Sequence, residues 1–481
     1  MTVRLKDSGA IVVGTGAGGA VAAASLARAG VDVLILEEGR LFKPSDLGGY
    51  VDAISDMYLS GATTVALGRP PVSITVGRAV GGTTAINSST CFRPPREKVA
   101  AWGGPDYEEF VPLFEEIERR INAKPADIEL LGGNWRVLKR GCDALGIGIR
   151  PLVHNIRDCK MRGRCAFGCP EGAKQSMDVT FVPDAIAAGA TLLTGHSVKR
   201  IIIEKGRAVG VAGVGPDGPF EARSRSVVVA MGALRTPAFL LKQKIANSSR
   251  RVGKGLRIHP AGRVVAEMNE IVDGHIGISQ GAFIDKWASR GVTLEGIFLN
   301  PGVMTTSLPG VGHELKDLAA AYRRLSAFGA MVSDTSSGRV IPGHFGYPFN
   351  AFYQLNLHDA HNLRFAVARI AEIYLAAEAK RVFTGFHPVP VVDSPESLRK
   401  LEAVRLKTSD LEVMAFHPLG TCAMGADPRR SVVNFDLESH DVKELYIMDA
   451  SAIPDSLGVN PQITIMAIAM RAARALASKL K

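Results

Sequence analysis

Glycines near the start of the chain have the spacing of a dinucleotide-binding turn. Gly14, Gly16 and Gly19 fit the pattern G-x-G-x-x-G. The first glycine permits a tight turn, the second lets a pyrophosphate approach the backbone, and the third lets a helix pack closely on a strand. Glu37 follows at the position where a carboxylate would accept hydrogen bonds from ribose hydroxyls. These residues predict nucleotide binding, but they do not distinguish FAD from NAD.

A second group of reactive residues is a run of cysteines. Cys159, Cys165 and Cys169 lie close together, and Pro170 follows the last of them. Three thiolates can ligate a [3Fe–4S] cluster. Zinc is less favoured because C-x2-C spacing and an obvious fourth ligand are missing. The residues leave iron–sulfur ligation and buried free thiols as equal alternatives.

The elements expected around the glycine turn form a strand–turn–helix–strand unit. Residues 10–13 are a short apolar strand, residues 20–29 an Ala-rich helix, and residues 31–36 a second buried strand. This order is the first half of a doubly wound α/β fold with parallel strands. Further strands are expected near 201–203, 227–230 and 445–448, and helices near 107–121, near 362–379 and from about 461. Residues 40–135 are otherwise expected to be irregular.

Composition excludes several classes of function. The chain has 481 residues, too many for one compact core, and a formal net charge of +10. Its basic residues are dispersed, so we expect no nucleic-acid partner. The sequence has no unbroken run of about 18 apolar residues. We therefore expect a cytoplasmic protein without a transmembrane segment.

Four later segments decide the nature of the cofactor. In order, they resemble the sequence signatures of the glucose–methanol–choline (GMC) oxidoreductases: residues 77–87, 232–241, 252–260 and 417–461. Each motif is weak alone, but the ordered set is specific. Residues 262–405 match the family only loosely.

The resemblance implies FAD and a known arrangement of domains. It implies an α/β fold with a Rossmann-type FAD-binding domain built from discontinuous segments, and a sheet-based α+β substrate domain. The expected limits are 1–155 and 156–261 for the first two parts of the FAD-binding domain, 262–407 for the substrate domain, and 408–481 for the C-terminal part. The second part includes the cysteine segment, residues 159–176.

The same resemblance assigns residues to the cofactor. The expected contacts are Gly81, Gly82, Thr83 and Asn87 near the flavin, Asp449 and Ala450 near the phosphates or ribityl chain, and Val198 near the adenine. Some relatives attach the flavin to a histidine just after the first signature, but this chain has Ser88 to Cys91 there.

The resemblance also implies two catalytic side chains. His417 occupies the family's active-site histidine position in His-Pro-Leu-Gly-Thr. A histidine suits removal of a hydroxyl proton because its ordinary pKa is near working pH. Asn460 would hydrogen-bond the substrate oxygen. We therefore expect oxidation of a rather apolar primary or secondary alcohol to an aldehyde or ketone, with hydride passing to the flavin and His417 acting as base.

The acceptor of the electrons stays open. The cysteine segment resembles both long-chain alcohol or sterol oxidases and FAD sugar dehydrogenases that carry a cluster. If the chain is an alcohol oxidase, oxygen accepts the electrons. The alternative is an electron-transferring FAD/iron–sulfur dehydrogenase subunit that oxidises a sugar or polyol and passes electrons to a protein or quinone. His417 and Asn460 argue against a third reading, a nucleotide-binding scaffold without catalysis.

Overall fold

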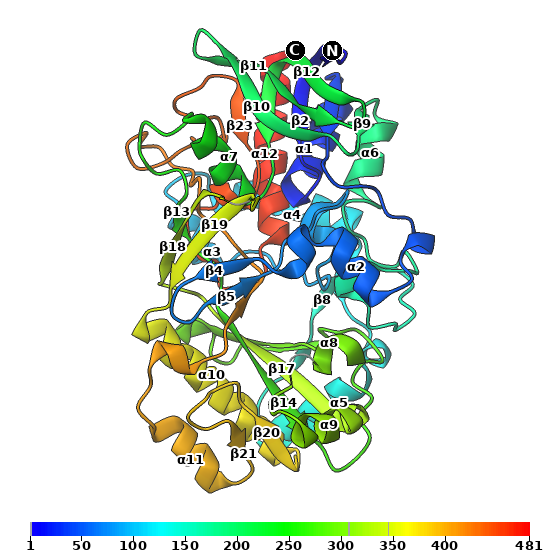
Figure 1. Ribbon diagram of the computed structural model, residues 1–481, viewed down its shortest axis with the longest axis vertical. Helices are drawn as coiled ribbons and strands as arrows, with labels where there is room; N and C mark the ends of the chain where they lie inside the picture. Colours follow the sequence, from blue (N-terminus) through cyan, green and yellow to red (C-terminus); the bar gives the residue numbers. More distant parts are fainter. Residues whose placement is uncertain (1, 306–307, 345) are drawn as a thin grey trace.

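The computed structural model describes residues 2–305, 308–344 and 346–481. The chain forms two sheet-based regions, one above the other in Figure 1. Both termini lie at the outer end of the upper region, so the first and last segments of the chain share that region. No helix among the described residues is both long enough and apolar enough to cross a membrane.

The upper region is built on a sheet of eight strands within the described chain. They are β1 (Val3–Arg4), β2 (Ser8–Val13), β3 (Val33–Leu36), β9 (Thr191–Leu193), β10 (Ser197–Glu204), β11 (Arg207–Gly215), β12 (Gly218–Val229) and β23 (Leu445–Ile447). β2 pairs in parallel with β3 and β12, while β23 pairs in parallel with β12 and β9 with β3. β3 and β23 are fully buried and β2 is mostly buried, as expected for apolar strands of a parallel sheet that is covered on both faces.

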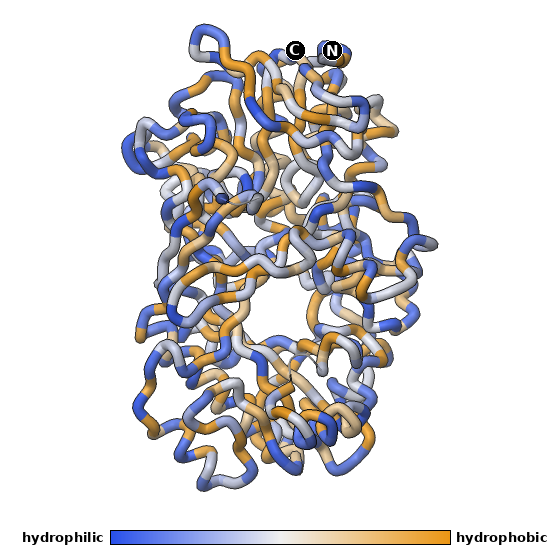
Figure 2. Tube along the Cα trace, viewed as in Figure 1, coloured by the Kyte–Doolittle hydropathy of each residue, from blue (hydrophilic) through white to orange (hydrophobic). Residues whose placement is uncertain are grey.

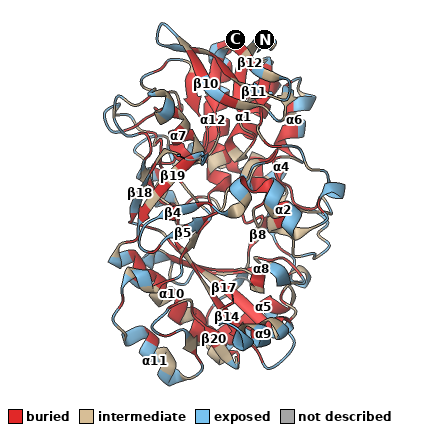
Figure 3. Ribbon diagram, viewed as in Figure 1, coloured by how far each residue is buried: buried red, intermediate tan, exposed pale blue. Residues whose placement is uncertain are grey.

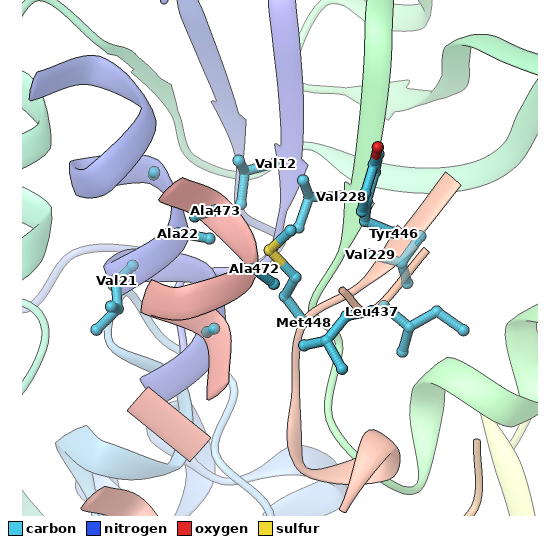
Figure 4. Packing of buried hydrophobic residues seen from close by; sticks show 14 of the residues in the cluster. Val12, Val21, Ala22, Val228, Val229, Leu437, Tyr446, Met448, Ala472 and Ala473 are labelled. Carbon is cyan, nitrogen blue, oxygen red and sulfur yellow. The ribbon is translucent and has the colours of Figure 1, made fainter. Parts of the chain in front are cut away.

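Helices cover this sheet and hold it against the C-terminal segment. α1 (Ala17–Arg28) follows β2 and packs against α12 (Gln462–Leu480), with α6 (Phe181–Ala187) and α4 (Tyr107–Arg120) beside them. Figure 4 shows Ala22 of α1 near Ala472 and Ala473 of α12. These small side chains let the two helices approach closely, and both pack onto the apolar core around the sheet.

The lower region is built on a sheet of thirteen strands within the described chain. They are β4 (Val65–Leu67), β5 (Val72–Ile74), β7 (Arg150–Pro151), β13 (Lys254–Leu256), β14 (Ala261–Glu267), β15 (Ala282–Ile284), β16 (Val292–Gly296), β17 (Leu325–Val332), β18 (Ser337–Pro342), β19 (Phe349–Gln354), β20 (Arg381–Phe383), β21 (Val391–Val392) and β22 (Met414–Ala415). β14, β17 and β16 are antiparallel neighbours. Figure 3 shows β14 and β17 as largely buried.

Helices accompany the lower sheet. α10 (Leu357–Ala376) packs on β14 and β17, and α5 (Gly132–Ala144) and α11 (Pro395–Ala403) pack on α10. α8 (Pro301–Thr305) and α9 (His313–Ala320) lie near the other face. Figure 2 shows hydrophobic positions inside both regions and hydrophilic positions on many outer loops.

The structure confirms the expected fold class, a Rossmann-like α/β region with a second, sheet-rich region. The limits expected for the domains stay a prediction. β4 and β5 belong to the lower sheet although they fall within residues 1–155. The expectation of irregular chain over 40–135 is partly wrong, because that stretch also contains α2 (Tyr50–Met57), α3 (Arg96–Ala100) and the start of α5.

Candidate active site

A cavity of about 590 Å³ lies where the glycine turn, the segment around residues 77–87 and the C-terminal segment meet the lower sheet. Its volume is within the usual range for a cofactor or ligand site. Most of the residues expected at the cofactor line it: Gly14, Gly16, Glu37, Gly82, Thr83, Asn87, Val198, Asp449 and Ala450. Gly19 and Gly81 are not among the residues that line it. His417 and Asn460 line it too.

The glycine turn needs glycine for a different reason at each position. Gly14 has a φ of 102°, which favours glycine. A Cβ on Gly19 would stand 2.1 Å from the carbonyl oxygen of Gly14, so that position must lack a side chain for α1 to pack on the turn. A Cβ on Gly16 would meet no atom within 4 Å. Packing within the protein therefore does not require glycine at 16, and the open space beside its backbone can admit a ligand.

Thr15 joins this turn to two other segments. Its hydroxyl donates to Glu37 Oε2 at 2.7 Å and accepts from the Gly81 N–H at 3.0 Å. Glu37 also accepts from the backbone N–H groups of Thr15, at 2.9 Å, and Gly39, at 2.8 Å. Burial raises the pKa of Glu37, and these hydrogen bonds oppose the rise. The Glu37 carboxylate therefore fixes the turn as well as lining the cavity.

The turn at Gly81 and Gly82 closes over the glycine turn. A Cβ on Gly82 would lie 2.9 Å from the Cα of Gly16, so the two backbones approach closely there. Further along the same segment, Asn87 Nδ2 donates to Gln462 Oε1 at 3.1 Å. Gln462 begins α12 and also donates to the carbonyl of Thr90 at 2.6 Å. Sequence reasoning did not single out Gln462, which connects the first signature to the C-terminal helix.

Asp449 connects the second signature to the C-terminal segment. Its carboxylate accepts from the Gly232 N–H at 2.8 Å, the Thr236 hydroxyl at 2.6 Å and the Ser451 N–H at 2.8 Å. Burial raises its pKa, and these donors oppose the rise. Ala450 follows it on the cavity wall.

His417 and Asn460 meet at the cavity. The Nε2 atom of His417 is 3.3 Å from the Nδ2 atom of Asn460. His417 Nδ1 and Asn460 Oδ1 are buried without a hydrogen-bond partner among the described residues. Burial lowers the pKa of His417 to about 4, so the imidazole is neutral at physiological pH. The pair thus presents a proton acceptor and an amide in one place.

Glu295 is a third polar residue at this point, and sequence reasoning missed it. It lies on β16 and its Oε2 accepts from Asn460 Nδ2 at 3.4 Å. Burial raises the pKa of Glu295 to about 7, and the Asn460 hydrogen bond opposes the rise. The sequence contains no motif around Glu295, and the burial of all five residues of β16 becomes visible only with the fold.

His259 lies beside His417 but is already engaged. The two ring centroids are 5.3 Å apart. His259 Nε2 accepts from the backbone N–H groups of Leu457, at 3.0 Å, and Gly458, at 3.2 Å. This ring therefore fixes the loop that precedes Asn460.

The three clustered cysteines are free thiols in this structure. Burial raises the pKa values of Cys159 and Cys165. Buried Lys174 organises the segment, donating to the carbonyls of Ala85, at 2.7 Å, and Cys165, at 2.7 Å. Among the described residues, no group of three or more His, Cys, Asp or Glu side chains is arranged to hold a metal ion. The structure does not support the expected [3Fe–4S] alternative at Cys159, Cys165 and Cys169.

Comparison with known proteins agrees with this arrangement. Family models described as GMC oxidoreductase match residues 54–261 and 335–469, and one described as an NAD(P)-binding Rossmann-like domain matches residues 12–56. A GMC-type oxidoreductase of Mycobacterium tuberculosis is 35% identical over 98% of this chain and 76% of its own length. A long-chain-alcohol oxidase of Arabidopsis thaliana is 26% identical over 97% of this chain and 67% of its own length.

Solved structures share the fold. A formate oxidase of Aspergillus oryzae superposes with a TM-score of 0.73 and 17% identity, covering 99% of each chain. At this level of identity the likeness concerns the fold alone.

Proposed function

Because this chain belongs to the GMC oxidoreductase family, we propose that it oxidises an apolar primary or secondary alcohol to an aldehyde or ketone, with His417 as the base. Members of the family are FAD-dependent oxidoreductases, alcohol oxidases among them. The observation that carries the proposal is the 3.3 Å approach of His417 and Asn460 in the cavity that the glycine turn also lines.

The residues present fit FAD. The space beside Gly16 and the N-terminus of α1 suit a pyrophosphate, because backbone N–H groups and the helix dipole favour an anion. Glu37 and Val198 are on the cavity wall for the adenosine, and Gly82, Thr83, Asn87, Asp449 and Ala450 for the rest of the cofactor. When bound, FAD accepts the hydride that leaves the alcohol carbon.

His417 and Asn460 can divide the handling of the hydroxyl between them. The neutral imidazole of His417 accepts the hydroxyl proton at Nε2, while the Asn460 amide donates to the substrate oxygen. A hydroxyl between the two side chains would replace their mutual contact and keep both groups hydrogen-bonded. Loss of the hydroxyl proton to His417 accompanies loss of the hydride, so the product carries a carbonyl group.

Glu295 supports this arrangement through Asn460. The Asn460 amide nitrogen has two hydrogens, and Glu295 Oε2 accepts one of them at 3.4 Å. The second is then directed toward His417 and the substrate oxygen. Glu295 is therefore a positioning residue for the amide.

The rest of the lining favours an apolar substrate. Apolar side chains surround the part of the cavity between α2, α8 and the lower sheet: Ile54, Phe167, Ile297, Phe298, Val303 and Phe416. Contacts of this kind select a hydrocarbon chain rather than a sugar, whose hydroxyls would lose hydrogen bonds to water. This lining favours an apolar alcohol over the sugar or polyol alternative.

Anaerobic mixing of the yellow holoenzyme with a panel of primary and secondary alcohols tests the proposal. Bleaching of the flavin absorbance by apolar alcohols, with slower bleaching by sugars, is the expected result. Failure of every alcohol to bleach a fully loaded enzyme refutes it. Admission of oxygen then distinguishes the acceptors, because an oxidase forms peroxide and a dehydrogenase requires a dye or a quinone.

A further inference from the structure

One sheet carries both the floor of the cavity and an exposed face. In the lower sheet, Val65 of β4 pairs with Ser73 of β5, which pairs with Met414 of β22. Met414 pairs in turn with Ala261 of β14. Side chains of directly paired residues point to the same face of a sheet. The last three residues line the cavity, so Val65 lies on the face that forms the cavity floor.

Beyond β5 this face is not covered. Val65 and Leu67 alternate along β4 and are 41% and 55% exposed. Leu67 pairs with Phe352 of β19, and Phe352 pairs with Arg339 of β18. Arg339 pairs with Lys254 of β13, which completes a row across four strands that lie on the left of Figure 1. These five side chains form the outer face of the sheet. The alternate residues belong to the apolar core behind it: Ala66, Val340 and Ala351.

The outer face has a basic end. A groove of about 680 Å³ there is lined by residues that include Arg251, Lys254, Arg339, Leu67 and Phe352, and no acidic side chain lines it within the described chain. The Arg339 guanidinium lies over the Phe352 ring, 5.2 Å from its centroid. None of the three basic side chains forms an ion pair with a described carboxylate. Their charges are therefore available to an anion outside the protein.

The cavity reaches solvent beside this outer face. Ser73 and Phe416 both line the cavity, yet Ser73 is exposed and Phe416 is 37% exposed. Val65 is the direct partner of Ser73. An apolar molecule in contact with Val65 is therefore one strand away from the lining of the cavity.

We propose that the outer face docks on an anionic phospholipid bilayer, and that the apolar alcohol enters the cavity from that bilayer. The inference rests on the proposed function for the nature of the substrate alone. Exposed apolar side chains beside basic ones suit the boundary between the acyl chains and the headgroups. Arg339 can bind phosphate oxygens through two parallel hydrogen bonds, and Lys254 is attracted by the negative surface. A strongly acidic protein would complement these two charges but not the apolar pair on β4.

Flotation of the holoenzyme with lipid vesicles tests the docking without any turnover. One set of vesicles is phosphatidylcholine alone, and in the other set phosphatidylserine replaces about a third of that lipid, which makes the surface anionic. The unchanged protein should bind the anionic vesicles more tightly. Added salt should weaken this binding because it screens the charges.

Two double variants of exposed residues test the outer face. Arg339→Gln with Lys254→Gln should weaken binding to anionic vesicles by about 25-fold, because each basic side chain near such a surface contributes about fivefold. Val65→Ser with Leu67→Ser should weaken it by about tenfold, since less apolar surface enters the bilayer. If the second variant fails to fold, the first still decides.

The matched controls lie in the upper region. Arg225→Gln with Lys205→Gln removes the same charge from exposed positions, and Val214→Ser replaces a strand valine that is 48% exposed. These variants should bind anionic vesicles as the unchanged protein does. If they weaken binding as much as the outer-face variants do, the attraction follows the net charge of +10, and the proposal is overturned.

Flavin bleaching tests the entry of substrate from the bilayer. A long-chain alcohol carried in anionic vesicles should bleach the flavin of the outer-face variants more slowly than that of the unchanged protein. A short alcohol dissolved in water should bleach all of them equally. Equal rates with the vesicle-borne alcohol would overturn this route of entry.

The other outcomes are also decisive. No preference for anionic vesicles, or a preference that survives both outer-face variants, overturns the docking. Poly-glutamate is the probe for an acidic protein partner, and binding of this polymer through Arg339 and Lys254 without vesicle binding would overturn it too. Vesicle binding through the outer face without bleaching by any alcohol would refute the proposed oxidation and leave the docking standing.

Discussion

Replacement of Glu295 by glutamine removes a buried acid and keeps its shape. Burial raises the pKa of this carboxyl from its ordinary value of 4.5 to about 7. In the folded protein the group therefore holds its proton up to about pH 7, whereas in the unfolded chain it loses the proton near pH 4.5. Glutamine does not titrate in this range. Comparing the pH dependence of the stability of the two proteins therefore measures the effect of the difference in the pKa of Glu295 between the folded and unfolded states.

The direction of the pH dependence follows from the coupling between proton binding and folding. The folded state binds the proton more tightly, so the contribution of Glu295 to stability is fully present below pH 4.5 and is lost as the pH rises through 7. Each tenfold difference in proton affinity corresponds to about 1.4 kcal/mol, so ionised Glu295 costs about 3 kcal/mol at high pH. About 2.5 kcal/mol of this develops between pH 5 and pH 8.

Chemical unfolding of both proteins at pH 5 and pH 8, at one fixed FAD concentration, measures this quantity. Glu295→Gln should gain stability over the unchanged protein by about 2.5 kcal/mol more at pH 8 than at pH 5. Glu267→Gln is the control on the same sheet. Burial raises the pKa of Glu267, but hydrogen bonds from Lys380 and Arg381 lower it overall. Glu267 is therefore largely ionised in both the folded and the unfolded state from pH 5 to pH 8, so the stability difference between this variant and the unchanged protein should be nearly the same at the two pH values. A stability difference for Glu295→Gln that does not change with pH would refute the reasoning.

Three further predictions concern the cofactor and the reaction. His417→Ala should lower the rate of anaerobic flavin reduction by about 10²–10⁴ with FAD still bound, and near-normal reduction would remove His417 from the mechanism. Asn460→Ala should lower the same rate by about 10²–10³ because a donor to the substrate oxygen is lost, and an unchanged rate would exclude that contact. Gly16→Val should still fold, because a Cβ at position 16 meets no atom within 4 Å. Its side chain would fill the space expected for the pyrophosphate, so the variant should not retain FAD. A yellow variant would show that the pyrophosphate does not approach there.

The sequence was sufficient to predict those elements whose structure is decided by residues close to one another in the chain. The glycine turn, β2 and β3 follow from a short apolar run and three glycines, and the structure has them at the expected place. The helix expected at 362–379 begins earlier, at Leu357. Asn356 caps it by accepting from the Asp359 N–H at 2.8 Å, a signal that the sequence did contain.

α5 could not be predicted in this way, because its glycines argue against a helix. Gly133 and Gly141 lie inside it, and glycine ordinarily weakens a helix. A Cβ on Gly133 would stand 1.7 Å from the carbonyl oxygen of Val272, and one on Gly141 would stand 2.1 Å from that of Ile373. These glycines allow close contact with distant segments, so tertiary packing overrides local propensity.

The polar residues on the floor of the cavity depend even more on distant pairing. Glu267 and Glu295 are the same residue type on strands of the same sheet, yet one has a lowered pKa and the other a raised one. The difference arises because Glu267 ends β14 beside two basic side chains, whereas Glu295 faces the cavity and an amide. Only the register of β14, β17 and β16 brings Arg263 into the same row as Glu295. Local sequence patterns do not encode that register, so this part of the site becomes visible only with the fold.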